Sequence, residues 1–145
     1  AMLPIFQLLG TEYCRKDIIT RFINKEKMYD GFTKISFIYP HAVASMKVGQ
    51  GAKSEGEMIV SGTKGYIYVP APWWKTDYFE VRYENQQNNK RYFYQLDGEG
   101  LRYELLSFLK AIRTGKEFSY VANDISKAIT STIADFYAHQ DMTVI

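Results

Sequence analysis

Residues 57–69 read EMIVSGTKGYIYV, and this stretch decides how the chain is interpreted. A glycine-rich turn at 62–65 lies between two runs of β-branched and aromatic residues, which is typical of a β-hairpin. The same two-residue period extends in both directions and predicts strands at 17–25, 32–39, 42–48, 57–61, 66–69, 78–84 and 91–96. No helical pattern separates these strands, and connections this short favour antiparallel neighbours.

After residue 97 the apolar period changes to that of a helix. The first predicted helix carries an apolar stripe at Leu101, Leu105, Phe108 and Ile112, is capped by Asp97 or Gly98, and ends at Gly115. The second is capped by Asn123 or Asp124 and carries Ile125, Ile129 and Phe136. Both stripes need an apolar partner surface. We therefore predict an α+β fold, a mainly antiparallel open sheet of about six to seven strands with the two C-terminal helices packed on one face.

The helical stripe gives a prediction for one side chain. Phe108 is expected to lie in the core, where replacement by alanine would cost about 3–5 kcal/mol.

Composition limits the class of protein. The chain has 145 residues, a net charge of +2, 46% hydrophobic and 23% charged residues, close to average globular usage. This excludes a disordered chain, a coiled coil and a membrane span, and the charge is too small to indicate a nucleic-acid partner. Cys14 is the single cysteine, so no internal disulfide forms. We expect one soluble, cytoplasmic domain.

Sequence motifs for catalysis are missing from the chain. Gly49-Gln50-Gly51 begins like a dinucleotide fingerprint, but a strand follows where a helix is required. His41 and His139 lie at a turn and at a helix end, with no sign of a shared site. We predict no catalytic, cofactor-binding or metal-ligating residue here.

Aromatic residues are the unusual feature of the composition, with 12 Tyr, 9 Phe and 2 Trp. Ten of them lie between positions 66 and 94. Because side chains alternate along a strand, Tyr66 and Tyr68 are expected to share one face of the sheet, and so are Tyr92 and Tyr94. Phe93 is expected to point the other way, into the core. An open face rich in tyrosine is typical of protein interfaces or sugar-stacking surfaces. The alternative is a sheet with one partly solvent-exposed face, in which aromatic residues are present only because they favour strands.

The segment PAPWW at 70–74 carries the candidate site. Its two prolines stiffen a connection that leaves a strand. Trp74 and Trp73 are the predicted substrate-binding residues, one facing a ligand and the other packing inward. Packing of both rings into a core or a domain interface is the alternative.

Four segments occur in a specific order: GEMIVSGTKGYI at 56–67, PWW at 72–74, GEG at 98–100 followed by Tyr103-Glu104, and FLKAIRTGK at 108–116. This ordered set resembles the C-terminal domain of the Gfo/Idh/MocA oxidoreductases, relatives of glucose-fructose oxidoreductase and inositol dehydrogenase. The order and spacing are most similar to the branch that contains dimeric dihydrodiol dehydrogenase. The resemblance covers nearly the whole chain, from a helix end at 3–10 to the last helix.

The resemblance implies a two-domain NAD(P)-dependent dehydrogenase acting on a sugar, polyol or related alcohol. A Rossmann domain would precede this α+β domain, residues 1–145, and would hold the cofactor and every catalytic residue. This chain alone would then bind no cofactor and be inactive. Its implied partners are that Rossmann domain, a small-molecule substrate, and further copies that contact its open sheet face in a homo-oligomer.

Some residues match the branch that contains dimeric dihydrodiol dehydrogenase, and others differ from it. Trp74 matches a tryptophan that faces the substrate there, whereas Gln95 and Leu96 replace its aromatic and acidic residues. The residues by themselves leave a different class open, a stand-alone carbohydrate-binding or dimerisation module without catalysis.

Overall fold

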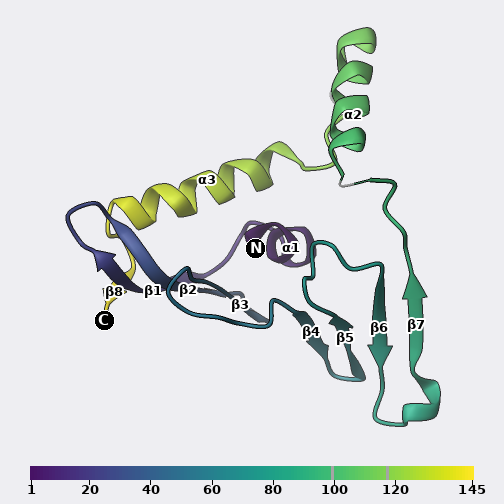
Figure 1. The fold of residues 1–145 in the computed structure, drawn as a ribbon, viewed down its shortest axis with the longest axis horizontal. Coiled ribbons are helices and arrows are strands. Elements are labelled where there is room, and N and C mark those ends of the chain that lie inside the picture. The colour runs from purple at the N-terminus through teal and green to yellow at the C-terminus, as the bar shows by residue number, and fades with distance from the viewer. Residues whose placement is uncertain (99, 117) are drawn as a thin grey trace. The chain divides into compact units, whose positions relative to one another are not determined.

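A computed structural model describes residues 1–98, 100–116 and 118–145 of the chain. These residues form two compact units, one made of 1–53 together with 120–145 and the other of 54–119. The second unit is therefore an insertion between the two halves of the first, as the colours of Figure 1 show.

The first unit is built on a four-stranded sheet in the order β3-β2-β1-β8. Its elements are α1 (Met2–Leu9), β1 (Arg15–Asn24), β2 (Tyr29–Ile38), β3 (Val43–Val48), α3 (Asn123–Tyr137) and β8 (Met142–Val144). β1, β2 and β3 form an antiparallel meander, as predicted, and β8 joins β1 in parallel. A parallel strand needs a long crossover, which here contains the second unit and α3.

One face of this sheet carries the core. The register aligns Ile18 of β1 with Ile35 of β2, and Phe37 lies further along the same face. These side chains pack with Phe6 of α1 and Tyr39, and α3 adds Ile125, Ala128, Ile129 and Phe136. Phe37 is fully buried, with ring centroids 5.0 Å from Phe6 and 5.1 Å from Tyr13.

A buried charge lies on the same face. Lys16 of β1 is only 4% exposed, and its Nζ donates a hydrogen bond to Asp135 of α3. Asp141 Oδ2 is 3.9 Å away but its side chain is 59% exposed. Asp135 is thus the main partner of a lysine that burial would otherwise leave uncompensated.

The second unit is a four-stranded antiparallel sheet in the order β4-β5-β6-β7. Its elements are β4 (Met58–Gly62), β5 (Gly65–Val69), β6 (Tyr78–Arg82), the 3₁₀ turn η1 (Gln86–Asn88), β7 (Lys90–Phe93) and α2 (Leu101–Thr114). Gly65 in the first hairpin cannot be replaced without strain, because a Cβ there would lie 2.4 Å from the carbonyl oxygen of Arg82.

The predicted α+β class and all seven predicted strands are confirmed, but their grouping was wrong. Instead of one sheet of six to seven strands there are two sheets of four, and the short β8 was not predicted. The helices are also divided. α3 packs on the first sheet, whereas α2 belongs to the second unit. The predicted end of α2 at Gly115 is confirmed, whereas its N-cap is Gly100 rather than Asp97 or Gly98. No described helix has both the length and the apolar character that crossing a bilayer requires.

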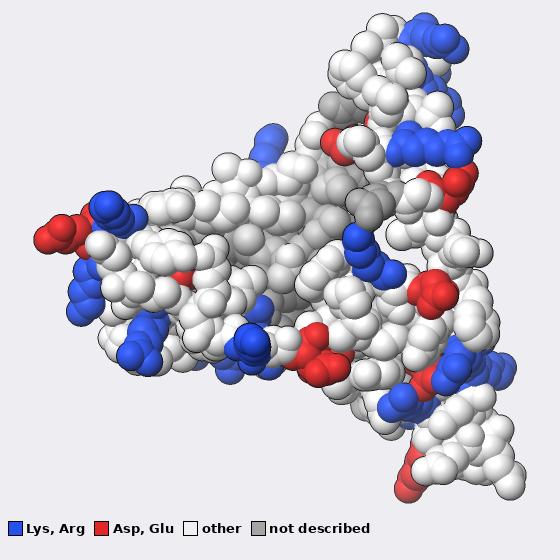
Figure 2. Space-filling view, viewed as in Figure 1, with Lys and Arg blue, Asp and Glu red and all other residues white. Residues whose placement is uncertain are grey.

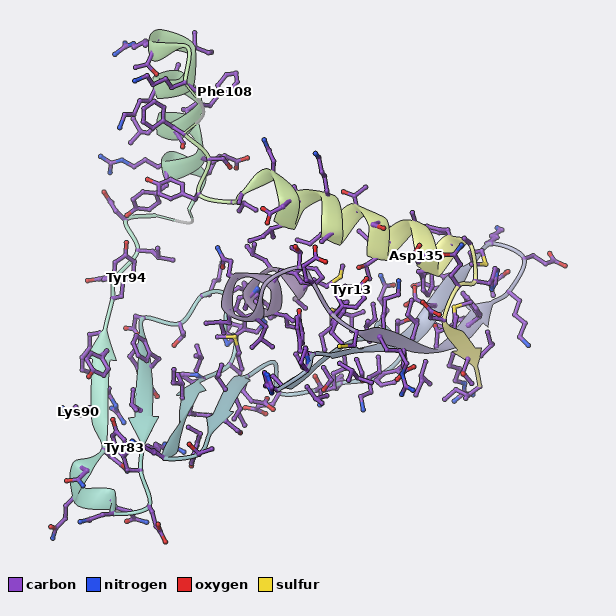
Figure 3. The ribbon with its side chains drawn as sticks, turned by 180° about the vertical axis from the view of Figure 1, so that it is seen from behind. Tyr13, Tyr83, Lys90, Tyr94, Phe108 and Asp135 are labelled. Carbon is purple, nitrogen blue, oxygen red and sulfur yellow. The ribbon has the colours of Figure 1, made fainter. Side chains whose placement is uncertain are left out.

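The apolar stripe of α2 is not buried. Its four side chains have exposures of 56–73%, at Leu101, Leu105, Phe108 and Ile112. Phe108, labelled in Figure 3, is 61% exposed, so the prediction that it lies in the core was wrong. The stripe follows the helical period, but among the described residues of the second unit no apolar surface excludes water from these four side chains.

Candidate functional site

The tryptophan segment connects β5 to β6. β5 ends at the buried Val69, and the following prolines leave the ladder. The amide of Trp73 donates a 3.0 Å hydrogen bond to the carbonyl of Gly56, just before β4. The amide of Lys75 donates a 2.8 Å bond to the carbonyl of Pro72, which closes a turn around the two rings. Backbone contacts therefore fix this connection against its own sheet.

The two tryptophan rings differ in exposure. Trp73 is half-buried, while Trp74 is 59% exposed. Their centroids lie 5.9 Å apart with the planes at 88°, so the edge of one ring supports the other. Gly56 lies beneath Trp74 with φ +79°, a conformation that favours glycine. The segment thus presents one large apolar ring to its surroundings on a rigid base.

Glu57 directly follows the glycine under Trp74. Its Oε2 atom is buried and has no hydrogen-bond partner among the described residues. Buried carboxylate oxygens are normally hydrogen-bonded, so this atom is an acceptor whose donor the described part of the chain does not supply.

A second feature is the face of the β4–β7 sheet that we call the tyrosine face. The register places on it Tyr66 and Tyr68 of β5, Tyr78, Glu80 and Arg82 of β6, and Arg91 and Phe93 of β7. The predicted pairing of Tyr66 with Tyr68 on one face is confirmed. Phe93, in contrast, is 71% exposed beside Tyr78, so the expectation that it reaches the core was wrong. Tyr92 lies on the opposite face and stacks on Phe79 at 5.0 Å.

Glu80 organises the charges of the tyrosine face. Its two carboxylate oxygens accept hydrogen bonds from Arg82 at 2.6 Å and from the Nε of Arg91 at 2.8 Å. Each guanidinium also covers a tyrosine ring, Arg82 at 4.4 Å from the centroid of Tyr68 and Arg91 at 4.6 Å from that of Tyr78. The cluster lines a polar depression of about 450 Å³.

This arrangement affects the ionisation of Glu80. Hydrogen bonds from Arg91, and then from Arg82, lower the pKa of the Glu80 carboxyl below its ordinary value. Because the folded-state pKa is the lower one, the cluster stabilises the fold above the unfolded-state pKa. That contribution is lost as the pH falls through the folded-state pKa.

Arg91→Gln is expected to raise the pKa of Glu80 toward its ordinary value, because it removes the largest cause of the shift. A carbon-13 NMR titration of the side-chain carboxyls measures this. Arg15→Gln is the matched control, since Arg15 pairs with Asp17 in the other unit. An unchanged Glu80 pKa in Arg91→Gln would contradict the assignment.

The sequence analysis missed the Glu80 cluster. The signal was present, because Glu80 and Arg82 are two residues apart on a predicted strand and Arg91 begins the next one. Only the register of β6 against β7, however, places Arg91 opposite Glu80.

Other candidate chemistry is accounted for by packing. The amide of Gly51 donates to the carbonyl of Gly31 at 2.8 Å, so one amide of the Gly49–Gly51 segment is bonded within the first unit. β4, not a helix, follows it, so this segment lacks the helix N-terminus that the dinucleotide fingerprint requires. Among the described residues no group of three or more His, Cys, Asp or Glu side chains forms a metal site. Figure 2 shows acidic and basic side chains interspersed on the face it draws.

No protein-family model matches the sequence, and no curated protein matches it significantly. Solved structures do match the fold. A variant of KijD10, a 3-ketoreductase from Actinomadura kijaniata in complex with TDP-benzene and NADP, aligns over 99% of this chain and 44% of its own, with a TM-score of 0.75 and 9% identity. Biliverdin reductase from Synechocystis, in complex with biliverdin and NADP+, aligns over 95% and 43%, with a TM-score of 0.68 and 16% identity.

Levoglucosan dehydrogenase, in complex with NADH and levoglucosan, aligns over 92% of this chain and 46% of its own, with a TM-score of 0.61 and 16% identity. The structural neighbours are oxidoreductases of the Gfo/Idh/MocA type, as the sequence resemblance predicted. At these identities the likeness establishes a shared fold. The chain spans less than half the length of each of the three.

Proposed function

We propose that this chain is the C-terminal domain of an NAD(P)-dependent oxidoreductase that acts on a sugar, polyol or related alcohol. In this proposal a Rossmann domain upstream supplies the nucleotide site and the catalytic residues. The present chain supplies one wall of the substrate pocket and a surface for homo-oligomerisation.

One observation carries the proposal. Nearly the whole chain matches the fold of reductases and dehydrogenases, whereas it corresponds to less than half of each of them. The neighbours were solved with NADP, NADP+ or NADH, which supports NAD(P) for the complete protein. Because the glycine-rich segment at 49–51 is followed by β4 and not by a helix, no step of the reaction is assigned to the residues of this chain.

Trp74 is the residue that we assign to the substrate. An exposed aromatic ring on a rigid base provides an apolar face on which the C–H surface of a sugar can stack. Trp73 holds that ring in position through its edge contact and its backbone hydrogen bond to Gly56.

We assign oligomer contacts to the tyrosine face. Tyrosine and arginine are enriched at protein interfaces and dominate their binding energy. The ion pairs with Glu80 leave both arginine side chains partly exposed, at 34% for Arg82 and 51% for Arg91. The face therefore combines large rings with preordered hydrogen-bond donors.

In the full-length enzyme, Trp74→Ala is expected to lower kcat/KM for the preferred sugar or polyol by about 10–100-fold, the usual effect of losing one good substrate contact. Trp74→Phe should recover part of the loss, because a ring is restored. Tyr137→Ala is the control, since Tyr137 is 62% exposed on α3. Equal effects of Trp74→Ala and Tyr137→Ala would contradict the assignment of Trp74.

Two measurements on the 145-residue chain separate the proposal from its alternative. Calorimetric titration with NAD and with NADP should show no binding at micromolar concentration, and binding of either would contradict a separate cofactor domain. A glycan array should show no binding by the isolated chain. Array signals that disappear in Trp74→Ala would instead favour a stand-alone carbohydrate-binding module.

A further inference from the structure

β7 is an edge strand of the second sheet. It pairs with β6 on one side, and within that sheet no described strand pairs with its other side. The ladder continues one residue beyond β7, because the amide of Tyr94 donates a 2.7 Å hydrogen bond to the carbonyl of Asp77. Backbone groups alternate in direction along a strand, so those of Tyr92 and Tyr94 point to β6. Those of Arg91 and Phe93 point outward.

Aromatic side chains cover this open edge. Phe93 is 71% exposed, Tyr94 is 62% exposed and Tyr92 is 45% exposed. Tyr94 can be found in Figure 3 just past the end of β7. Edge strands are commonly protected by charged side chains. Here the charges, Lys90 and Arg91, stand only at the start of the strand, and the aromatic part has none.

We propose that β7 pairs antiparallel with β7 of a second copy of this chain, centred on Phe93. In this register Phe93 lies opposite Phe93 of the second copy, and Tyr92 lies opposite Tyr94. Aromatic side chains thus oppose each other at three successive positions, and such cross-strand pairs stabilise sheets.

Charge supports the same register. Arg91 lies opposite the neutral Gln95 of the second copy. A centre at Arg91 would instead place two arginines opposite each other, which destabilises a sheet. A centre at Tyr94 would need extended backbone past Gln95, beyond the observed ladder.

This interface goes beyond the proposed function and does not depend on it. It uses the edge of the sheet, whereas the oligomer contact proposed above uses the tyrosine face. The two share Phe93 and Arg91, but Tyr92 projects from the side of the sheet opposite to the tyrosine face, so a disulfide formed through position 92 reports on the edge pairing.

Disulfide trapping tests the pairing in a Cys14→Ser background, because Cys14 is exposed and would react. One chain carries Tyr92→Cys, and a second chain with a different tag carries Tyr94→Cys. Directly opposed residues of this kind lie about 4.5 Å apart between Cα atoms, within disulfide range. The mixed disulfide should exceed both homodisulfides by about tenfold, because residues offset along the strands lie at or beyond about 7 Å.

Val43 provides matched controls, since it is also 71% exposed at the edge of a sheet, in the first unit. Chains with Val43→Cys should form the background level of disulfide. In sedimentation experiments Phe93→Lys should weaken self-association at least about tenfold, because it places two charges opposite each other, and Val43→Lys should not. A mixed disulfide at the Val43 level, a larger homodisulfide yield or unchanged association of Phe93→Lys would each overturn the proposal.

Discussion

Replacing Asp135 with alanine is expected to lower the free energy of unfolding by about 3–5 kcal/mol, the usual cost of removing one partner from a buried ion pair. The substitution leaves the Lys16 ammonium in a site where its side chain is 3% exposed. The nearest remaining carboxylate, Asp141, is 3.9 Å away and 59% exposed, so it compensates poorly. Urea denaturation followed by far-UV circular dichroism measures the change.

Two further variants make this result specific. Asp17→Ala removes the exposed partner of Arg15, so it should cost no more than about 1 kcal/mol. Combining Lys16→Met with Asp135→Leu should recover most of the loss, because an apolar pair of similar volume removes the buried charge altogether. If Asp135→Ala costs as little as Asp17→Ala, the pair does not hold α3 against β1.

Phe37→Ala is expected to cost about 3–5 kcal/mol, the range for emptying an aromatic core site. Phe37 is fully buried against Phe6 of α1 and Tyr13 of the connection between α1 and β1. These rings are held by the sheet below and by α1, so the cavity cannot close without moving an element. Thermal unfolding and urea denaturation both report the loss.

Phe108→Ala is the matched comparison. The same substitution at a ring that is 61% exposed should change stability by less than about 0.5 kcal/mol. A loss at Phe108 as large as that at Phe37 would mean that the stripe of α2 is buried in solution.

The seven predicted strands are confirmed. In β1, β2 and β3 the alternating side chains reflect burial on one face, a local property of the sequence, whereas β6 and β7 show no such burial pattern. β8 was not predicted because the three residues Met-Thr-Val are too few to show an alternating pattern. Its pairing with Ile18–Thr20 of β1 also depends on α3, which precedes it and brings the chain back to the first sheet. The division into two sheets is likewise not local. Alternation tells which residues share a face but not which strand lies alongside.

The candidate site was predictable only in part. The prolines before Trp73 and Trp74 indicated a stiff connection, and in the structure Trp73 is half-buried while Trp74 is exposed. The two faces of β7 were misassigned because an alternating pattern does not show which face is exposed to solvent. Phe93 was therefore predicted to lie in the core. The Glu80 cluster needed the strand register, which hydrophobic patterning does not provide.

The discontinuous first unit has a consequence for synthesis on the ribosome. Domains generally fold as units while the chain emerges. Residues 54–119 form a continuous segment and are complete before α3 has been made, whereas the first sheet lacks its β8 edge and its α3 cover until then. The part of the core that α3 covers, and the edge of β1 with which β8 pairs, therefore stay accessible to chaperones throughout the translation of the second unit. The unit that begins first in the sequence is the last to close.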